Sequence, residues 1–535
     1  MRGARSVADP KTDVMRRRLR LRGEQGMVLP IALGILAVLS ISVVVVIDSS
    51  SANSRSASRS KGGVNAFALA EAGINNAMSV LMKPGANAID PYTFCPDSTQ
   101  APSLPCWSTN SYEGGSVQWT GALTVTTGGA YWTLTSRSTV RNPTGGSKSI
   151  QRTLTARAPV YPAPSQPLNS PSWNYIYSRN PGTGVAFSGC DMTVGNSVQI
   201  ASPLYVNGNL CFQNQATMLG SARELVVRGS LTFQNSAGGS IATSASPIAQ
   251  AHIAKGCDYK GTQRVPCVYG APTAGSNVFA TTLDANAGSV QPPTVLWNDW
   301  YLNANPGPYY PCLPPASGEA ANPTWSFDPT VAAGSASDAV KLTYKNNNAG
   351  LINLTPSSSY TCKTWAGELS WNATTHVLTT RGTLFIDGSA KIDNGFTNSY
   401  TGQGVIYMSG TLLIKNSKLC GALSGSNCTT TGWNPNNTLI TFVTNGTGSS
   451  GAPDSQVSAG LGAQLISSHA QTAIYSTYNI EVGTTSLVDG PLDGGTVILG
   501  QTSNSAFPPF TIVPSGMPGN QAIFAVAGNP EMFSG

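Results

Sequence analysis

The most constraining feature of the chain is a basic leader that meets an apolar run between Gly26 and Met27. Residues 1–26 carry eight Lys or Arg and three acidic residues, whereas the 21 residues 27–47 carry no charge. A helix of that length rises about 31 Å, enough to cross the hydrocarbon core of a bilayer. Positive charge beside a span stays in the cytoplasm, so we expect a single-pass membrane protein with its N-terminus cytoplasmic and its bulk extracellular. The span accounts for the basic residues, and we expect no nucleic-acid partner.

Three interpretations of this segment compete. A cleaved secretory signal has an apolar region of about 7–15 residues, which is shorter than this run, although the small residues 49–52 could offer a cut. A plain signal anchor requires only the span. The third interpretation is a leader cut directly after Gly26, where a glycine separates the basic residues from the apolar run.

Residues 23–33 read Gly-Glu-Gln-Gly-Met-Val-Leu-Pro-Ile-Ala-Leu and resemble the N-terminus of type IV pilin-like proteins, most closely the PilX-type minor pilins. The resemblance implies a prepilin leader, cleavage after Gly26 by a prepilin peptidase, and N-methylation of the new N-terminus, Met27. One position departs from the usual pattern, because most pilins have Glu at the fifth residue after the cut and this chain has Ile31. A charge buried without a partner is costly, so the missing acid favours a minor or tip subunit, which lacks one neighbour.

The second matching segment is a predicted helix at 67–81. Its apolar residues fall three or four apart and form one stripe: Phe67, Ala70, Ile74, Ala77, Met78 and Leu81. Lys83, Pro84 and Gly85 end it. The Ala-Glu-Ala-Gly sequence at 70–73 also occurs in PilX-like proteins, and Glu71 is interpreted as a solvated acid on the helix surface. Between span and helix, the polar residues 48–65 fit either a continuous helix or a flexible stalk.

A small antiparallel sheet is predicted next, within residues 83–158. Residues 116–120, 131–136 and 150–156 are rich in β-branched and aromatic residues and are separated by glycine-rich turns. A long N-terminal helix followed by such a sheet is the pilin architecture, so the resemblance covers residues 23–158. A Pro-rich linker is predicted at 159–169.

Residues 170–535 are predicted to form a large extracellular β-rich domain. Only 10% of the whole chain is charged, which is low for a cytoplasmic enzyme. Residues 204–212 are echoed by 225–233, and residues 384–392 by 405–414. Spacing of about 20–28 residues is typical of one coil of a β-helix. We expect a right-handed β-helix, with a β-sandwich as the alternative.

The ten cysteines all follow the span, which indicates disulfides formed in an oxidising compartment. We expect neighbours to pair, although the sequence does not fix the connectivity. The expected pairs are Cys95 with Cys106, Cys190 with Cys211, Cys257 with Cys267, Cys312 with Cys362, and Cys420 with Cys428. The three histidines, His252, His376 and His469, are isolated in the sequence and no Cys-x-x-Cys occurs, so no metal site is expected.

The competing function is a membrane-anchored extracellular enzyme that cleaves polysaccharides, because many β-helices do so. It needs paired carboxylates, and the candidate pairs are Asp387 with Asp393 and Asp489 with Asp493. Asp387 and Asp489 each precede a glycine, which is ordinary turn chemistry. Aromatic residues gather in a Pro-rich stretch and fit either a glycan-binding surface or loop packing: Trp297, Trp300, Tyr301, Tyr309 and Tyr310.

Taken together, these patterns predict a minor pilin-like subunit of a type IV pilus or related filament, located at the cell surface. The predicted role is pilus assembly and cell adhesion, with no catalytic residues and no cofactor. The predicted partners are a prepilin peptidase, other pilin subunits, the membrane and surface glycans.

Overall fold

The structure of the chain is a computed structural model. It describes residues 28–83, 88, 93–94, 106–126, 129–145, 148–162, 166–167, 170–234, 239–270, 272–295, 297, 310–311, 326–327, 351–357, 359–363, 367–386, 388–448, 457–500, 503–504, 507–508, 511–514, 516–519 and 525–534. The leader and the predicted cleavage site at Gly26 and Met27 lie outside these residues.

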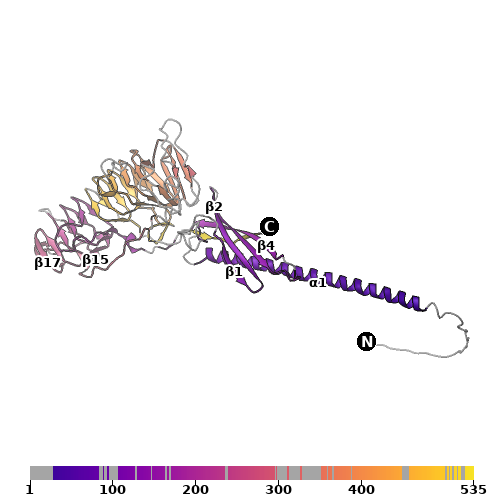
Figure 1. Cartoon of the computed structure of the whole chain (residues 1–535). Helices are drawn as coiled ribbons and strands as arrows, with labels where there is room; N and C mark the ends of the chain where they lie inside the picture. The colour runs from indigo at the N-terminus through magenta and orange to yellow at the C-terminus, as the bar shows by residue number, and fades with distance from the viewer. Residues whose placement is uncertain are drawn as a thin grey trace, which may run out of the picture.

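One helix, α1 (Val28–Leu81), forms the N-terminal part of the described chain. Its 54 residues correspond to a length of about 81 Å, and it projects away from the rest of the molecule (Figure 1). The polar residues 48–65 are helical and continue the apolar run without a break. Of the two structures that the sequence left open for this segment, the continuous helix is observed.

The C-terminal third of α1 packs on the sheet through small residues. Gly62, Ala66, Ala70 and Gly73 are buried, and the Ser138 hydroxyl donates a 2.5 Å hydrogen bond to the Ala66 carbonyl oxygen. Most of the predicted stripe is buried here, but Phe67 is 42% exposed.

Gly73→Ala is expected to lower the free energy of unfolding by about 1–3 kcal/mol through overpacking. A Cβ at position 73 would lie 2.2 Å from the Ser136 hydroxyl oxygen and 2.7 Å from a methyl carbon of Val117. The matched control is Gly63→Ala in the same helix, whose Cβ would meet nothing closer than 3.8 Å and which should be neutral or stabilising by up to about 1 kcal/mol. Denaturant titration of both variants checks this, and equal effects would contradict it.

Six antiparallel strands form the small sheet, in the order β1-β2-β3-β4-β42, with β43 also paired to β4. The strands are β1 (Ser108–Tyr112), β2 (Gly115–Thr126), β3 (Gly129–Val140), β4 (Ile150–Pro162), β42 (Ala525–Ala527) and β43 (Glu531–Ser534). Trp132 is fully buried between this sheet and α1, its ring packed edge-on against Phe94 with centroids 4.9 Å apart. The three strands predicted from the sequence lie within β2, β3 and β4.

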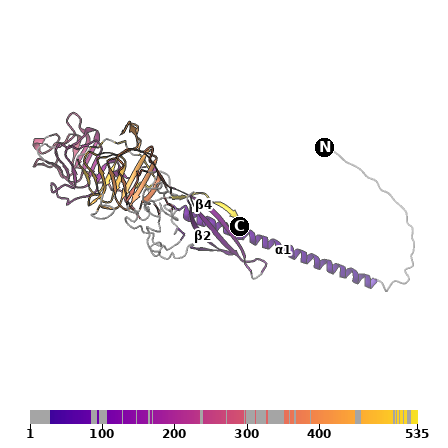
Figure 2. The same cartoon turned by 90° about the horizontal axis from the view of Figure 1, so that it is seen from above.

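The C-terminus returns to the small sheet, which corrects two expected boundaries. Residues 154–157 of β4 pair with β43, and residues 160–162 pair with β42. The predicted linker at 159–169 therefore begins inside a strand, since Pro159 pairs with Tyr131 and Pro162 with Ala525. The large domain does not extend to residue 535 but is inserted between β4 and β42. Figure 2 shows the C-terminus beside α1, at the small sheet.

The large inserted domain is mainly β, and most of its strands pair in parallel across successive coils of the chain, whereas residues 257–264 and 360–382 include antiparallel pairs. Leu204 pairs with Leu225, and Leu384 with Ile406, which is the register that the two repeats predicted. In the part of the domain that the structure describes, an 11-stranded and a 20-stranded sheet result, and they enclose one continuous apolar cluster. This pairing is parallel where a β-sandwich would be antiparallel.

The two halves of the inserted domain meet in its middle. The first half runs from β6 (Ile176–Ser178) and β7 (Met192–Val194) outward to β17 (Thr262–Arg264). The second half begins at β21 (Leu351–Asn353), and its last strands are β38 (Leu492–Gly494), β39 (Val497–Leu499) and β40 (Ser503–Asn504). β38 then pairs with β6, and β39 with β7. The chain thus enters and leaves at the centre of the stack, while β15 (Ile248–Ile253) and β17 lie at the end far from α1 (Figure 1).

Among the described residues of the large domain, three disulfides tie local segments together. They join Cys190 to Cys211, Cys257 to Cys267, and Cys420 to Cys428, each a neighbouring pair as expected from the sequence. Cys106 is disulfide-bonded as well, whereas Cys95 and Cys312 lie outside the described residues. Cys362 is placed in β22 (Tyr360–Lys363) by its backbone.

Candidate functional sites: the exposed helix and the polar clusters of the large domain

The N-terminal part of α1 presents an apolar surface on all sides. Every large apolar side chain from Val28 to Ile47 is more than half exposed. An 18-residue window of this helix has a mean hydropathy of 2.8 and no buried residue, so α1 is long and apolar enough to cross a membrane. A helix that is apolar all round requires lipid or other helices around it. Ile31, at the position where most pilins have an acid, is 56% exposed on this surface.

An ion pair joins the two halves of the large domain where they meet. Arg179 follows β6, and its Nε lies 3.1 Å from Oδ1 of Asp493 in β38, whose side chain is fully buried. The Arg179 guanidinium also donates to the Tyr475 hydroxyl at 2.6 Å and to the Ser476 carbonyl oxygen. It lies 4.5 Å from the centre of the Tyr475 ring, a cation–π contact. These bonds fasten the first coil to the last.

Burial raises the pKa of Asp493 to about 7, although Arg179 beside it opposes the shift. An acid whose pKa is raised on folding stabilises the fold most below its unfolded pKa, and that stability is lost as the pH rises through the folded value. We therefore expect the free energy of unfolding of the wild type, relative to Asp493→Asn, to fall by up to about 1.4 kcal/mol per pH unit between pH 4 and 7. Denaturant titrations of both proteins across this range check it, and parallel curves would contradict it.

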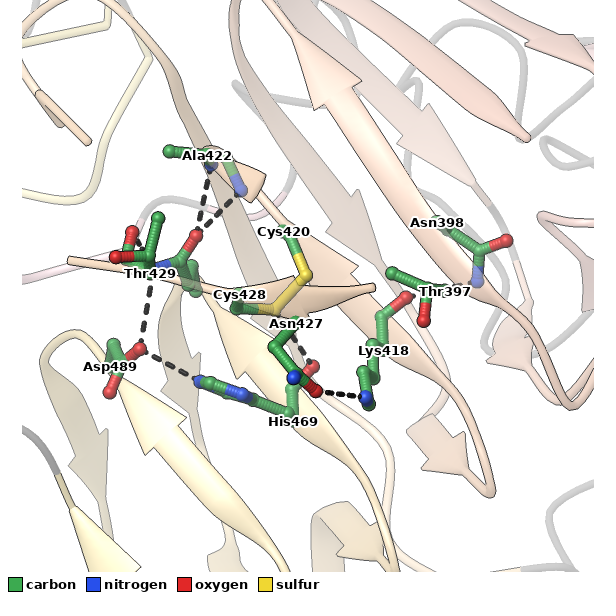
Figure 3. The surroundings of a disulfide bond; sticks show 12 residues. Thr397, Asn398, Lys418, Cys420, Ala422, Asn427, Cys428, Thr429, His469 and Asp489 are labelled. Atoms are coloured by element: carbon green, nitrogen blue, oxygen red, sulfur yellow. Dashed lines mark hydrogen bonds and ion pairs between the residues drawn. A yellow bond between two sulfur atoms is a disulfide. The ribbon is translucent and has the colours of Figure 1, made fainter. Parts of the chain in front are cut away.

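A second buried cluster surrounds the Cys420–Cys428 disulfide. His469 Nε2 lies 2.8 Å from Oδ2 of Asp489, which is 1% exposed, and the same oxygen accepts a bond from Gln471. The Gln471 amide oxygen accepts from the backbone N–H groups of Gly421 and Ala422. Figure 3 shows the His469–Asp489 pair close to the disulfide, and the Cys428 sulfur lies 4.0 Å from the His469 carbonyl oxygen. The cluster holds the loop that the disulfide closes in place.

The predicted carboxylate pairs do not form an open site among the described residues. Asp489 and Asp493 are both buried, and each is bonded to a different internal partner. Asp393 follows β25 (Ser389–Ile392), and Asp387 lies outside the described residues. Water and a polysaccharide chain therefore have no access to the Asp489–Asp493 pair.

The three histidines are each engaged, although they look isolated in the sequence. His252 Nδ1 lies 2.7 Å from Asp284 Oδ1, and His376 stacks on Phe396 with centroids 4.3 Å apart. His376 also stacks on Trp371, five residues earlier in the chain. Asp284, Asp489 and Phe396 lie 20 or more residues from the histidines that they contact, so only the coil register could have revealed these three contacts. Among the described residues, no group of three His, Cys, Asp or Glu side chains could hold a metal ion.

Only some residues of the predicted aromatic surface lie within the described part of the chain. Trp297 packs edge-on against Tyr407, with centroids 5.7 Å apart, which is a packing role. Trp300, Tyr301 and Tyr309 lie outside the described residues, and Tyr310 is placed by its backbone in β19 (Tyr310–Pro311).

Comparisons with known proteins give one structural likeness. No protein-family model matches the chain, and no curated protein matches it. Among solved structures, the crystal structure of the competence-associated pilin ComZ from Thermus thermophilus aligns with 88% of this chain and 98% of its own, at 11% identity and a TM-score of 0.26. A likeness at this TM-score does not define a shared fold and carries no conclusion about function.

Proposed function

We propose that the chain is a minor pilin-like subunit of a type IV pilus or related filament, acting in pilus assembly and surface adhesion. The observation that carries this proposal is α1. One unbroken helix exposes an apolar N-terminal part on all sides and buries the other end on a small antiparallel sheet. The exposed part suits first the membrane and then a bundle of neighbouring subunit helices.

In this proposal a prepilin peptidase removes the leader after Gly26, and Met27 becomes the methylated N-terminus. With the leader in the cytoplasm, α1 carries the rest of the chain outward. The large domain, which we take to be a right-handed β-helix, then extends beyond the sheet at the end opposite to the N-terminus (Figure 1). The burial of Asp489 and Asp493 supports a binding role over polysaccharide cleavage.

Gly26→Leu is expected to abolish most processing and to keep the chain out of surface filaments, because the branched side chain replaces the glycine at the cut. The matched control is Gly23→Leu, three residues upstream in the same leader, which should be processed like the wild type. Immunoblots of whole cells and of sheared filaments measure both effects. Equal processing of the two variants, or wild-type chain absent from the filaments, would contradict the proposal.

A further inference from the structure

A cleft on the large domain lies where three neighbouring coils begin their strands. Its volume is about 460 Å³, and its lining includes Asn174, Tyr175, Pro203, Arg223 and Glu224. Ile176, Leu204 and Leu225 pair in register across β6, β9 (Leu204–Val206) and β12 (Glu224–Val227). Tyr175, Pro203 and Glu224 directly precede or open these strands, so the coil stack itself places them in one row.

The aromatic wall of the cleft is held in position. The Tyr175 hydroxyl donates a 2.8 Å hydrogen bond to Glu224 Oε2. Its ring packs edge-on against buried Tyr205, with centroids 5.8 Å apart, and the Tyr205 hydroxyl is bonded to the backbone of Gly288 and Val290. Tyr175 is thus a half-buried ring whose orientation is fixed on two sides.

Hydrogen-bond donors and acceptors both line this cleft. Within the described part of the chain, neither the Arg223 guanidinium nor Glu224 Oε1 has a hydrogen-bond or ion-pair partner. Arg223 has a φ of 71°, a left-handed conformation that is uncommon for a residue other than glycine and that is seen at binding sites. Asn174 and Ser221 add an amide and a hydroxyl at the rim.

We propose that this cleft binds neutral sugars, which rests on the proposed role as an exported surface subunit. A fixed tyrosine ring offers an apolar face to the C–H groups of a sugar ring. Arg223 and Asn174 can donate hydrogen bonds, and Glu224 can accept them. Adjacent hydroxyl groups of a sugar therefore meet both a donor and an acceptor. The charges of Arg223 and Glu224 cancel, which favours a neutral ligand over an anionic one. The volume is in the range of small-molecule sites.

The test applies the detergent-solubilised full chain to an array of neutral oligosaccharides alongside sialylated and uronate-bearing ones. We expect binding to neutral glycans, weakened about tenfold or more by Glu224→Gln and by Arg223→Gln through the loss of charged hydrogen bonds. Arg264→Gln, an exposed arginine in β17, is the matched control and should bind like the wild type. Melting curves establish that each variant is folded, and Arg223→Gln changes only a surface side chain.

Binding to no neutral glycan, binding to acidic glycans alone, or unchanged affinity in both cleft variants would overturn the proposal. The mature N-terminus of the same preparation reports on the pilin role separately. A processed chain that binds no glycan refutes the cleft alone, whereas an unprocessed chain that binds neutral glycans refutes the pilin role and leaves the cleft standing.

Discussion

Arg179→Met is expected to lower the free energy of unfolding by about 3–5 kcal/mol at pH 8, because it leaves the Asp493 carboxylate buried without its cation. The loss should shrink toward pH 5, where protonated Asp493 needs no counterion. The pair also joins the first coil to the last, so we expect β6 and β38 to lose hydrogen-exchange protection together. Urea titration of the full chain in detergent measures the first effect, and amide exchange the second.

Two variants make this prediction specific. The double variant Arg179→Met with Asp493→Leu should recover most of the loss, because replacing a buried ion pair by apolar groups is often neutral. Arg228→Met removes another arginine of the same domain, whose 2.9 Å bond to Asn207 is exposed, and should cost less than about 1 kcal/mol. A double variant as unstable as Arg179→Met alone would show that the charge pair is not the cause.

Trp132→Ala is expected to destabilise the small sheet by about 3–5 kcal/mol. The ring is fully buried between β3 and α1, and its Nε1 donates a 2.6 Å hydrogen bond to the Ala88 carbonyl oxygen. The truncation therefore leaves a cavity and a buried carbonyl group without its donor. Hydrogen exchange in β2, β3 and the last turns of α1 should accelerate, while exchange in the large domain stays unchanged.

The control for this second prediction is Trp107→Ala. Trp107 is 39% exposed. The Arg137 guanidinium lies over its ring, with the guanidinium carbon 4.7 Å from the ring centre. Its loss should cost about 1 kcal/mol or less. Equal acceleration of exchange in both variants would mean that the helix–sheet contact does not depend on the buried ring.

Local patterns predicted the local structure well. The apolar stripe that begins at residue 67 predicted the buried part of α1, with the exception of the exposed Phe67. The echo of 204–212 in 225–233 predicted the coil register, because each coil must bury the same inward positions as its neighbour. The disulfides that the structure describes in full join cysteines close in sequence, which is why pairing neighbours found them.

Contacts between segments that are far apart in the chain leave no comparable pattern in the sequence. The pairing of β43 with β4, the meeting of β38 with β6, and the Arg179–Asp493 pair each join residues more than 300 positions apart. Nothing periodic links them, so the sequence could not show that the large domain is an insertion. The sugar-binding cleft is hidden for the same reason, since Tyr175 and Glu224 meet only once the coils stack.

The most direct test of the central claim is the mass of the N-terminal peptide of the wild-type chain isolated from cells. If the chain is a pilin-like subunit, that peptide begins at Met27 and carries one additional methyl group on its amino nitrogen. A peptide that begins within the leader, or one that begins near residues 49–52 after a signal-peptidase cut, would contradict the account. In the first case α1 would act as a plain anchor, and in the second the apolar N-terminal part of α1 would be lost from the mature protein.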